Sequence, residues 1–205
     1  MVYKNFKKSV IFLPLLFFCL TSYAQETKTI VNKIPSVAIN TNLLYDATTS
    51  MNLGLEFKLS NKSTLKLPVT YNPWTFSDNR KFKFILAQPE WRWWFCEPFS
   101  GSFFGIHAHY AFYNVGGMQN ILGIPLSDYM QTHRFEGWLA GAGISYGYVF
   151  YLAPRWSLEA SVGAGYAYMD YDKYPCEKCG QIISHDTKNY FGPTQAGISL
   201  IYFIK

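Results

Sequence analysis

The sequence predicts an all-β protein, an eight-stranded antiparallel up-and-down transmembrane β-barrel of the outer-membrane type. Three observations predict it. From Val37 onward, apolar and aromatic residues recur at every second position, with mostly small or polar residues between them. The connections between these segments are mostly short and long in turn, and aromatic residues stand at both ends of the apolar faces. A period of two is typical of strands whose two faces meet different surroundings.

Eight segments carry this alternation. The clearest runs from Leu53 to Leu59, where one side is wholly apolar and the other carries Glu56 and Lys58. Each segment is near or above the roughly 9–11 residues that a tilted strand needs to cross the hydrocarbon layer. The predicted strands are 37–46, 52–59, 64–72, 82–95, 103–114, 135–152, 156–171 and 194–204.

The connections between these strands differ in length. Short turns are predicted at 60–63, 96–101 and 153–155, and longer loops at 73–81, 115–134 and 172–193. The first connection, 47–51, is the exception because it is short on the side of the long loops. Outer-membrane barrels have short periplasmic turns and longer extracellular loops. We therefore expect both ends of the barrel chain on the periplasmic side.

The predicted outer faces carry two rings of aromatic residues with smaller apolar residues between them. The ring at the loop end consists of Tyr45, Tyr71, Phe112, Trp138 and Tyr168, and the ring at the turn end of Trp91, Trp93, Phe95, Phe150, Trp156 and Tyr202. Such girdles are typical of a wall that faces lipid. The alternative is a soluble lipocalin-like barrel, which should have its apolar residues inside. The polar inner faces favour the membrane barrel.

The N-terminal segment has the features of a secretory signal peptide. A basic start is followed by an apolar run over 10–20 and by small residues at Ser22 and Ala24. The alternative is a transmembrane anchor, but the run is shorter than the roughly 20 residues that a spanning helix needs. The expected organisation is a cleaved signal peptide at 1–24, a flexible periplasmic leader at 25–35 and the barrel at 36–205.

The charge of the chain argues against nucleic-acid binding. Removing Lys4, Lys7 and Lys8 with the signal leaves 18 − 3 = 15 basic residues against 13 acidic ones, a net charge of +2 instead of +5. The 16 Tyr and 6 Trp residues favour a membrane interface instead, because their rings are apolar with one polar group.

Six strings of residues resemble a domain-of-unknown-function family of Bacteroidetes outer-membrane proteins. They are NLLYDATT (42–49), YNPWTF (71–76), QPEWRWW (88–94), YNVGG (113–117), YDKYPCEKCG (171–180) and YFGPT (190–194). The resemblance covers essentially the whole chain after the signal. It implies an outer-membrane barrel and an anaerobic gut or oral bacterium. It implies no catalytic residues.

The predicted inner faces carry ionisable residues. An eight-stranded barrel is just wide enough to be filled by its own side chains, so one interpretation is a network of paired charges. A second is a lipid-modifying enzyme that uses the inward pair His107 and His109, and a third is a narrow pore. Ser145 and Ser161 show no nucleophile–base spacing, so we predict no enzyme and no cofactor. The predicted interior network is Glu56, Lys66, Glu90, Arg92, His107, His109 and Glu159.

Cys176 and Cys179 are a candidate disulfide in a predicted extracellular loop. The alternatives are a metal site and free thiols. His185 could supply a third ligand and Asp186 a weak fourth, but a structural zinc site takes four. Cys96 should lie at the opposite rim, a membrane thickness away.

The longest predicted loop, 115–134, is unusually apolar. It could fold over the barrel mouth as a lid or dock a partner, since exposed apolar patches usually mark interaction. The sequence therefore predicts a monomeric, non-enzymatic barrel that contacts outer-membrane lipid and carries a structural or partner-binding role, such as adhesion or surface assembly, through a surface protein or glycan. The candidate partner-binding residues are Met118, Ile121, Leu122, Ile124, Leu126 and Met130.

Overall fold

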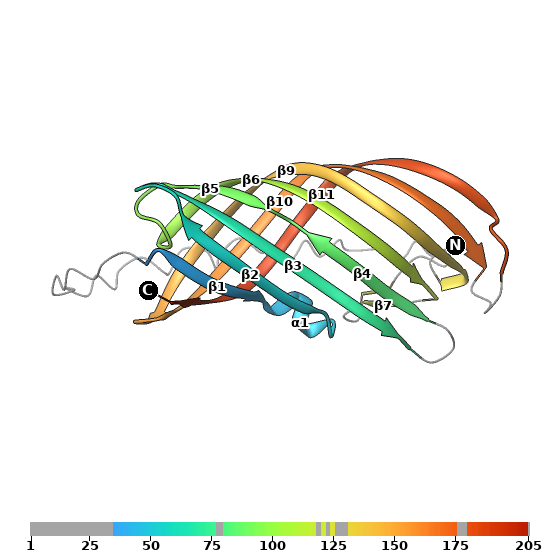
Figure 1. Cartoon of the computed structure of the whole chain (residues 1–205), viewed down its shortest axis with the longest axis horizontal. Coiled ribbons are helices and arrows are strands. Elements are labelled where there is room, and N and C mark those ends of the chain that lie inside the picture. Colours follow the sequence, from blue (N-terminus) through green and yellow to red (C-terminus); the bar gives the residue numbers. More distant parts are fainter. Residues whose placement is uncertain are drawn as a thin grey trace, which may run out of the picture. The chain divides into compact units, whose positions relative to one another are not determined.

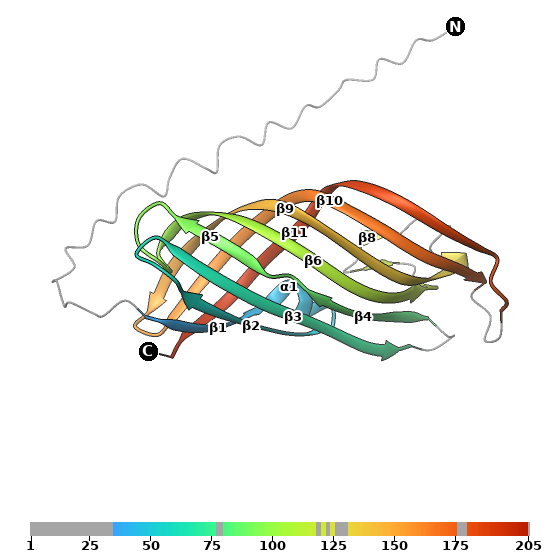
Figure 2. The same cartoon turned by 45° about the horizontal axis from the view of Figure 1, so that its top comes forward.

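The computed structural model describes residues 35–76, 80–117, 120–121, 124–125, 131–175 and 180–204. Within them the chain forms a closed eight-stranded antiparallel barrel, which confirms the predicted fold class (Figures 1 and 2). The barrel is built from β1 (Val37–Asn42), β2 (Met51–Lys58), β3 (Ser63–Thr75), β4 (Lys81–Ala87), β5 (Glu90–Trp94), β6 (Gly101–Gly116), β9 (His133–Ala153), β10 (Trp156–Pro175) and β11 (Ser184–Phe203). The helix α1 (Leu43–Ala47) follows β1, and β7 (Asn120–Ile121) pairs with β8 (Ile124–Pro125) as a separate hairpin.

Nine strands occupy eight positions because β4 and β5 are two halves of one predicted strand. Both pair with β3 on one side and with β6 on the other. The interruption falls at Gln88 and Pro89, and proline has no N–H to donate to a neighbouring strand. The barrel closes where Ala38–Asn42 of β1 pairs with Phe203–Ser199 of β11.

The first predicted strand is wrong beyond Asn42. The segment 43–47 is the helix α1, and the Asn42 side chain caps it by accepting a hydrogen bond from the Leu44 N–H at 3.1 Å. Tyr45 is therefore not part of an outer ring on a strand. Its ring lies 6.4 Å from that of Phe84, whose partner across the sheet, Asn72, is buried inside the barrel.

The strands on one side of the barrel are longer than predicted, β11 by far the most. β9, β10 and β11 have 21, 20 and 20 residues, whereas β1 and β2 have 6 and 8 (Figure 1). Most of the predicted loop 172–193 is therefore strand. Its residues lack the apolar alternation of the rest because they extend past the apolar part of the barrel, where both faces of a strand can be polar.

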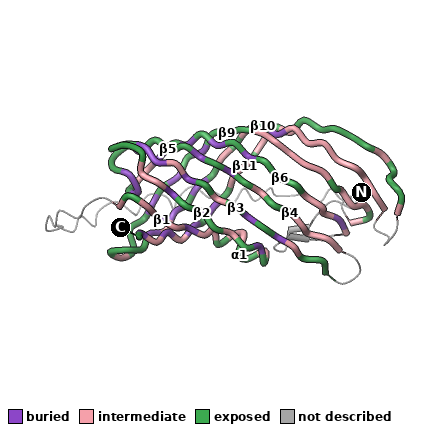
Figure 3. The backbone as a smooth tube through the Cα atoms, viewed as in Figure 1, coloured by how far each residue is buried: buried purple, intermediate pink, exposed green. Residues whose placement is uncertain are grey.

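An apolar cluster closes the interior at the end that holds the short turns. The Trp94 ring lies 5.0 Å from that of Phe103 and 6.0 Å from that of Phe99, which folds inward from the β5–β6 turn. Phe99 holds this position with a φ of +67°, which is uncommon for a residue other than glycine. Figure 3 shows the buried residues concentrated in this half of the barrel. The cluster comprises Ala38, Trp94, Phe99, Phe103, Val149, Ile201 and Phe203.

The outer surface carries a continuous set of exposed apolar side chains, which we call the apolar belt. Aromatic residues such as Trp93, Trp156, Tyr71 and Phe112 border it at the two ends. No helix in the described part of the chain is long and apolar enough to span a membrane. The belt includes Leu53, Leu55, Leu67, Val69, Ile85, Ile106, Ile144, Val162 and Ile198.

Candidate functional site

A cluster of ion pairs, which we call the ionic layer, fills the interior next to the apolar cluster, on the side of the loop end. Arg92 of β5 is at its centre. Its Nη1 and Nη2 atoms donate to the two carboxylate oxygens of Glu159 at 2.7 and 2.9 Å, its Nη1 also to Glu56 at 3.1 Å, and its Nε to Glu90 at 2.8 Å. Lys66 donates to Glu159 at 3.1 Å. All five residues are buried, with at most 5% exposure.

These residues meet because all five occupy inward positions, on strands β2, β3, β5 and β10. Glu56, Lys66 and Glu90 are direct neighbours across β2, β3 and β5, while Glu159 reaches Arg92 from β10. The Arg92 guanidinium also lies 4.1 Å from the centre of the Phe103 ring, so it joins the ionic layer to the apolar cluster. The layer holds three carboxylates and two cations.

Neutral groups provide the remaining hydrogen bonds of the carboxylates. The Thr64 hydroxyl donates to Glu56 at 2.6 Å, the Ser145 hydroxyl donates to Glu90, and the Gln195 amide donates to Glu90 at 3.4 Å. Next to the layer, a cavity of about 30 Å³ has room for about one water molecule. Ser145 therefore serves as a donor to a carboxylate, and the packing supports a lumen that is filled at the level of these ion pairs.

The two inward histidines are not part of this ionic layer. His107 and His109 are neighbours on β6, with ring centres 5.7 Å apart, and both are buried. His107 uses Nε2 to contact the Thr194 hydroxyl at 2.9 Å. Its Nδ1 and both ring nitrogens of His109 have no hydrogen-bond partner among the described residues. The interior is thus divided into a satisfied ionic layer and an unsatisfied histidine pair.

Sequence reasoning missed Thr194, which a β-bulge directs into the lumen. Gly163 of β10 pairs with Gln195 and the next residue, Ala164, pairs with Pro193, so Thr194 is the extra residue of β11. The His107 ring reaches it by passing over Gly163, where a Cβ atom would come within 3.1 Å of the ring. The only sequence signal was Pro193, because proline in a strand interior often marks a bulge or an edge.

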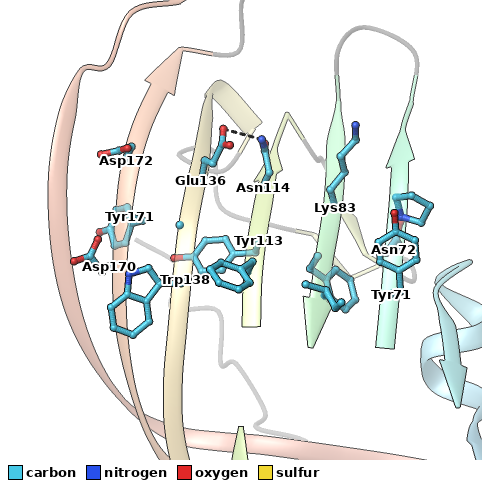
Figure 4. Close-up of a pocket in the computed structure, with 15 residues that line it drawn as sticks. Tyr71, Asn72, Lys83, Tyr113, Asn114, Glu136, Trp138, Asp170, Tyr171 and Asp172 are labelled. Atoms are coloured by element: carbon cyan, nitrogen blue, oxygen red, sulfur yellow. Dashed lines mark hydrogen bonds between the residues drawn. The ribbon is translucent and has the colours of Figure 1, made fainter. Parts of the chain in front are cut away.

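A shallow trough of about 540 Å³ crosses the outer face of β3, β4, β6, β9 and β10 at the loop end (Figure 4). The row of paired residues on its turn side is mostly apolar, and the row on its loop side is mostly polar. Asn114 and Glu136 on the polar row share a hydrogen bond of 2.8 Å. The trough thus marks the upper edge of the apolar belt. The rows are Tyr71, Ile85, Phe112, Trp138 and Asp170, then Pro73, Lys83, Asn114, Glu136 and Asp172.

His185 extends the polar row onto β11, where it contacts acidic residues. Its Nδ1 lies 2.9 Å from Asp172 and its Nε2 3.7 Å from Asp170. Cys176 and Cys179 lie outside the described residues, so the disulfide, metal and free-thiol alternatives stay predictions. Asp186 accepts a hydrogen bond from Ser184 at 2.7 Å. In the described part of the chain no group of three or more His, Cys, Asp or Glu residues could hold a metal ion.

We expect His185 to titrate above its ordinary pKa, because the hydrogen bond to Asp172 and the charge of Asp170 favour the protonated ring. The contact should therefore stabilise the paired ends of β10 and β11 fully below the ordinary histidine pKa, and lose this effect as the pH rises through the raised pKa. The NMR titration of the His185 ring in the detergent-solubilised barrel measures the shift. Asp172→Asn should lower the midpoint, and an unchanged midpoint would contradict the assignment.

The predicted partner-binding loop is only partly described. The backbone of Ile121 and Ile124 belongs to the β7–β8 hairpin, whereas Met118, Leu122, Leu126 and Met130 lie outside the described residues. At the opposite end Cys96 is an exposed free thiol in the β5–β6 turn.

Comparison with protein-family models matches residues 10–204 to a family described as a protein of unknown function, DUF3575. No curated protein and no solved structure matches the chain.

Proposed function

The chain belongs to the DUF3575 family of proteins of unknown function, and we propose that it is an outer-membrane barrel, a non-enzymatic anchor that presents surface loops to a partner. One observation carries the proposal: the apolar belt is on the outside of the barrel, while Arg92 and four other charged side chains are buried inside it. A soluble barrel has the opposite distribution. A surrounding membrane accounts for both faces, because lipid contacts the apolar outside while the charged side chains pair with one another inside.

The long strands give the barrel an outer part suited to contact a partner. A strand needs roughly 9–11 residues to cross the hydrocarbon layer, so β9, β10 and β11 extend well past the apolar belt. Ile182 and Ile183 are exposed beside β11 at the tip of the β10–β11 hairpin. We propose that this hairpin, with the adjoining cysteine loop and the apolar loop 115–134, contacts a surface protein or glycan.

The signal peptide at 1–24 remains part of this proposal as the means of export. Residues 1–34 lie outside those that the structure describes, so the cleavage after Ala24 and the leader at 25–35 are expectations.

The lipid-modifying alternative has one feature in its favour, the 2.9 Å contact between His107 and Thr194. A hydroxyl nucleophile and its base usually need a third group that orients the base. Nδ1 of His107 has no hydrogen-bond partner in the described part of the chain, so the contact supports a structural role better. For the narrow pore, the obstacle is the apolar cluster that fills the turn end around Trp94 and Phe103.

The location and orientation can be tested with two epitope insertions. An insertion between Gln181 and Ile182 lengthens the β10–β11 hairpin, and one between Pro154 and Arg155 lengthens the β9–β10 turn. We expect antibody to label intact cells carrying the first insertion, and to label cells carrying the second only after permeabilisation. Both proteins should remain in the outer-membrane fraction. Recovery as a soluble periplasmic protein, or the reverse labelling, would refute the proposal.

Partner binding by the loop 115–134 is tested in a separate experiment. Deleting residues 118–130 should leave the barrel assembled, because the barrel strands on either side, β6 and β9, end at Gly116 and begin at His133. Intact cells are treated with a membrane-impermeant crosslinker, and the species joined to the barrel are identified by mass spectrometry. Species joined to the natural chain should be lost from the deletion variant, whose heat-modifiable migration on gels should be unchanged. The same species in both samples would remove this loop as the binding surface.

A further inference from the structure

The barrel wall is incomplete on one side, where β1 ends. β1 pairs with β11 only over Ala38–Asn42, so the part of β11 before Ser199 has no strand beside it there among the described residues. The helix α1 stands at this gap. The Asn42 side chain fastens it to the edge of β11 by donating to the Ala196 carbonyl at 3.1 Å and accepting from the Ile198 N–H at 3.3 Å.

A slot of about 340 Å³ lies between α1 and the edge of β11. Its volume falls in the range of small-molecule sites, roughly 300–1,000 Å³. The back of the slot is the inner face of β4, so the slot passes from the gap in the wall to the opposite side of the lumen. Most of its lining is apolar: Leu44, Tyr45, Phe82, Phe84, Pro193 and Ala196.

The slot reaches the outer surface at Pro193 and Ala196, two exposed lining residues of β11 that are near exposed apolar residues of the belt. Met51 and Leu53, at the start of β2, are 54% and 59% exposed, and Ile198 on the edge of β11 is 42% exposed. In the proposed location these residues face the hydrocarbon of the membrane. The mouth of the slot and most of its lining are therefore both apolar.

The inner end of the slot is polar. Thr194 lines it, and its hydroxyl contacts His107 while its carbonyl accepts a hydrogen bond from the Gln88 amide at 3.2 Å. Gln195, which also lines the slot, donates to Glu90 of the ionic layer. Beyond these residues lies the small cavity of about 30 Å³. The slot thus has an apolar entrance and a hydrogen-bonding end.

We propose that the slot binds one acyl chain of a membrane lipid, which enters sideways between α1 and β11 and packs against Phe82 and Phe84. This inference rests on the proposed outer-membrane location. A lipid chain gains little hydrophobic free energy by moving from one apolar surrounding to another. The driving force is dispersion, because the walls of an empty apolar slot lack contact partners that an acyl chain supplies.

Lipid retention by the purified barrel tests the proposal. The folded protein in detergent is incubated with phosphatidylethanolamine vesicles, purified again and examined by native mass spectrometry. We expect one lipid to remain bound to each barrel. Ala196→Trp places a large side chain at the mouth and should weaken retention by roughly tenfold or more, since a single misfit carbon in an apolar pocket already costs roughly 10–200-fold.

Ala160→Trp is the matched control. Ala160 is also an exposed alanine of the belt, on the neighbouring strand β10, but it does not line the slot. It should retain lipid as the natural chain does, and both variants should keep heat-modifiable migration. Equal retention by the two variants, or no bound lipid on the natural chain, overturns the proposal. Because the assay uses purified barrel, it fails independently of the location, which the epitope insertions decide.

Discussion

Replacing Arg92 with methionine is expected to destabilise the barrel by about 3–5 kcal/mol, the usual cost of removing one partner of a buried ion pair. Arg92 contacts three buried carboxylates. Without it they would face one another with Lys66 as the only cation among these groups. Urea unfolding of the barrel in lipid vesicles, followed by the loss of heat-modifiable migration, measures the change.

Arg134→Met is the control for this substitution. Arg134 pairs with Glu136 at 3.8 Å and lies 4.3 Å from the centre of the Tyr174 ring; its side chain is 14% exposed and that of Glu136 is half exposed. A half-exposed ion pair contributes about 0–1 kcal/mol and a cation–π contact at an exposed site about 0.5–1 kcal/mol, so the control should lose clearly less stability than Arg92→Met. Adding Glu56→Gln to Arg92→Met should restore part of the loss, because in the described part of the chain Glu56 forms its ion pair with Arg92 alone and would be left unpaired. Equal stability of the two single variants would mean that the ionic layer does not hold the barrel together.

Replacing Gly141 with valine is expected to prevent assembly of most of the protein. A Cβ atom at Gly141 would lie 2.0 Å from the Tyr166 carbonyl oxygen and 2.4 Å from Nε2 of His109. The carbonyl belongs to the backbone of β10, so the two strands would have to move apart. Overpacking typically costs about 1–3 kcal/mol and sometimes more, and here it also disturbs the longest pairing of the barrel.

Ala142→Val provides the comparison one residue away. Ala142 is exposed on the outer face of β9, where a larger apolar side chain meets no backbone. The fraction that shows heat-modifiable migration after refolding into vesicles should be close to natural for Ala142→Val and small for Gly141→Val. Similar fractions would show that the close approach of β9 and β10 is not required.

The barrel could be predicted from sequence because its main determinant is local. Alternation assigns each residue to one face, and this was enough to bring Glu56, Glu90, Arg92 and Glu159 to the inside. The helix α1 could not be predicted in this way. Leu43 and Tyr45 continue the alternation of β1, and Asn42 has the same polar character whether it faces a lumen or caps a helix.

The features that depend on long-range geometry were also beyond sequence reasoning. The bulge at Thr194 adds one residue to β11, and apart from the neighbouring Pro193 nothing in the sequence indicates which residue turns inward. The slot requires the gap beside β11, and that gap exists only because β1 is short. The length of β11 was missed because Lys188 and Asp186 belong to a part of the strand that lies beyond the apolar belt.

The short β1 has a consequence for how the barrel closes and opens. β1 pairs five residues with β11 and four with β2, whereas β10 and β11 pair along 18 residues of β10. Local opening costs least where the fewest backbone hydrogen bonds must break. The first and last strands of the barrel meet at the seam between β1 and β11, and contacts so distant in sequence are the slowest to form. We therefore expect the wall next to α1 to pair last when the barrel folds and to open first when it unfolds.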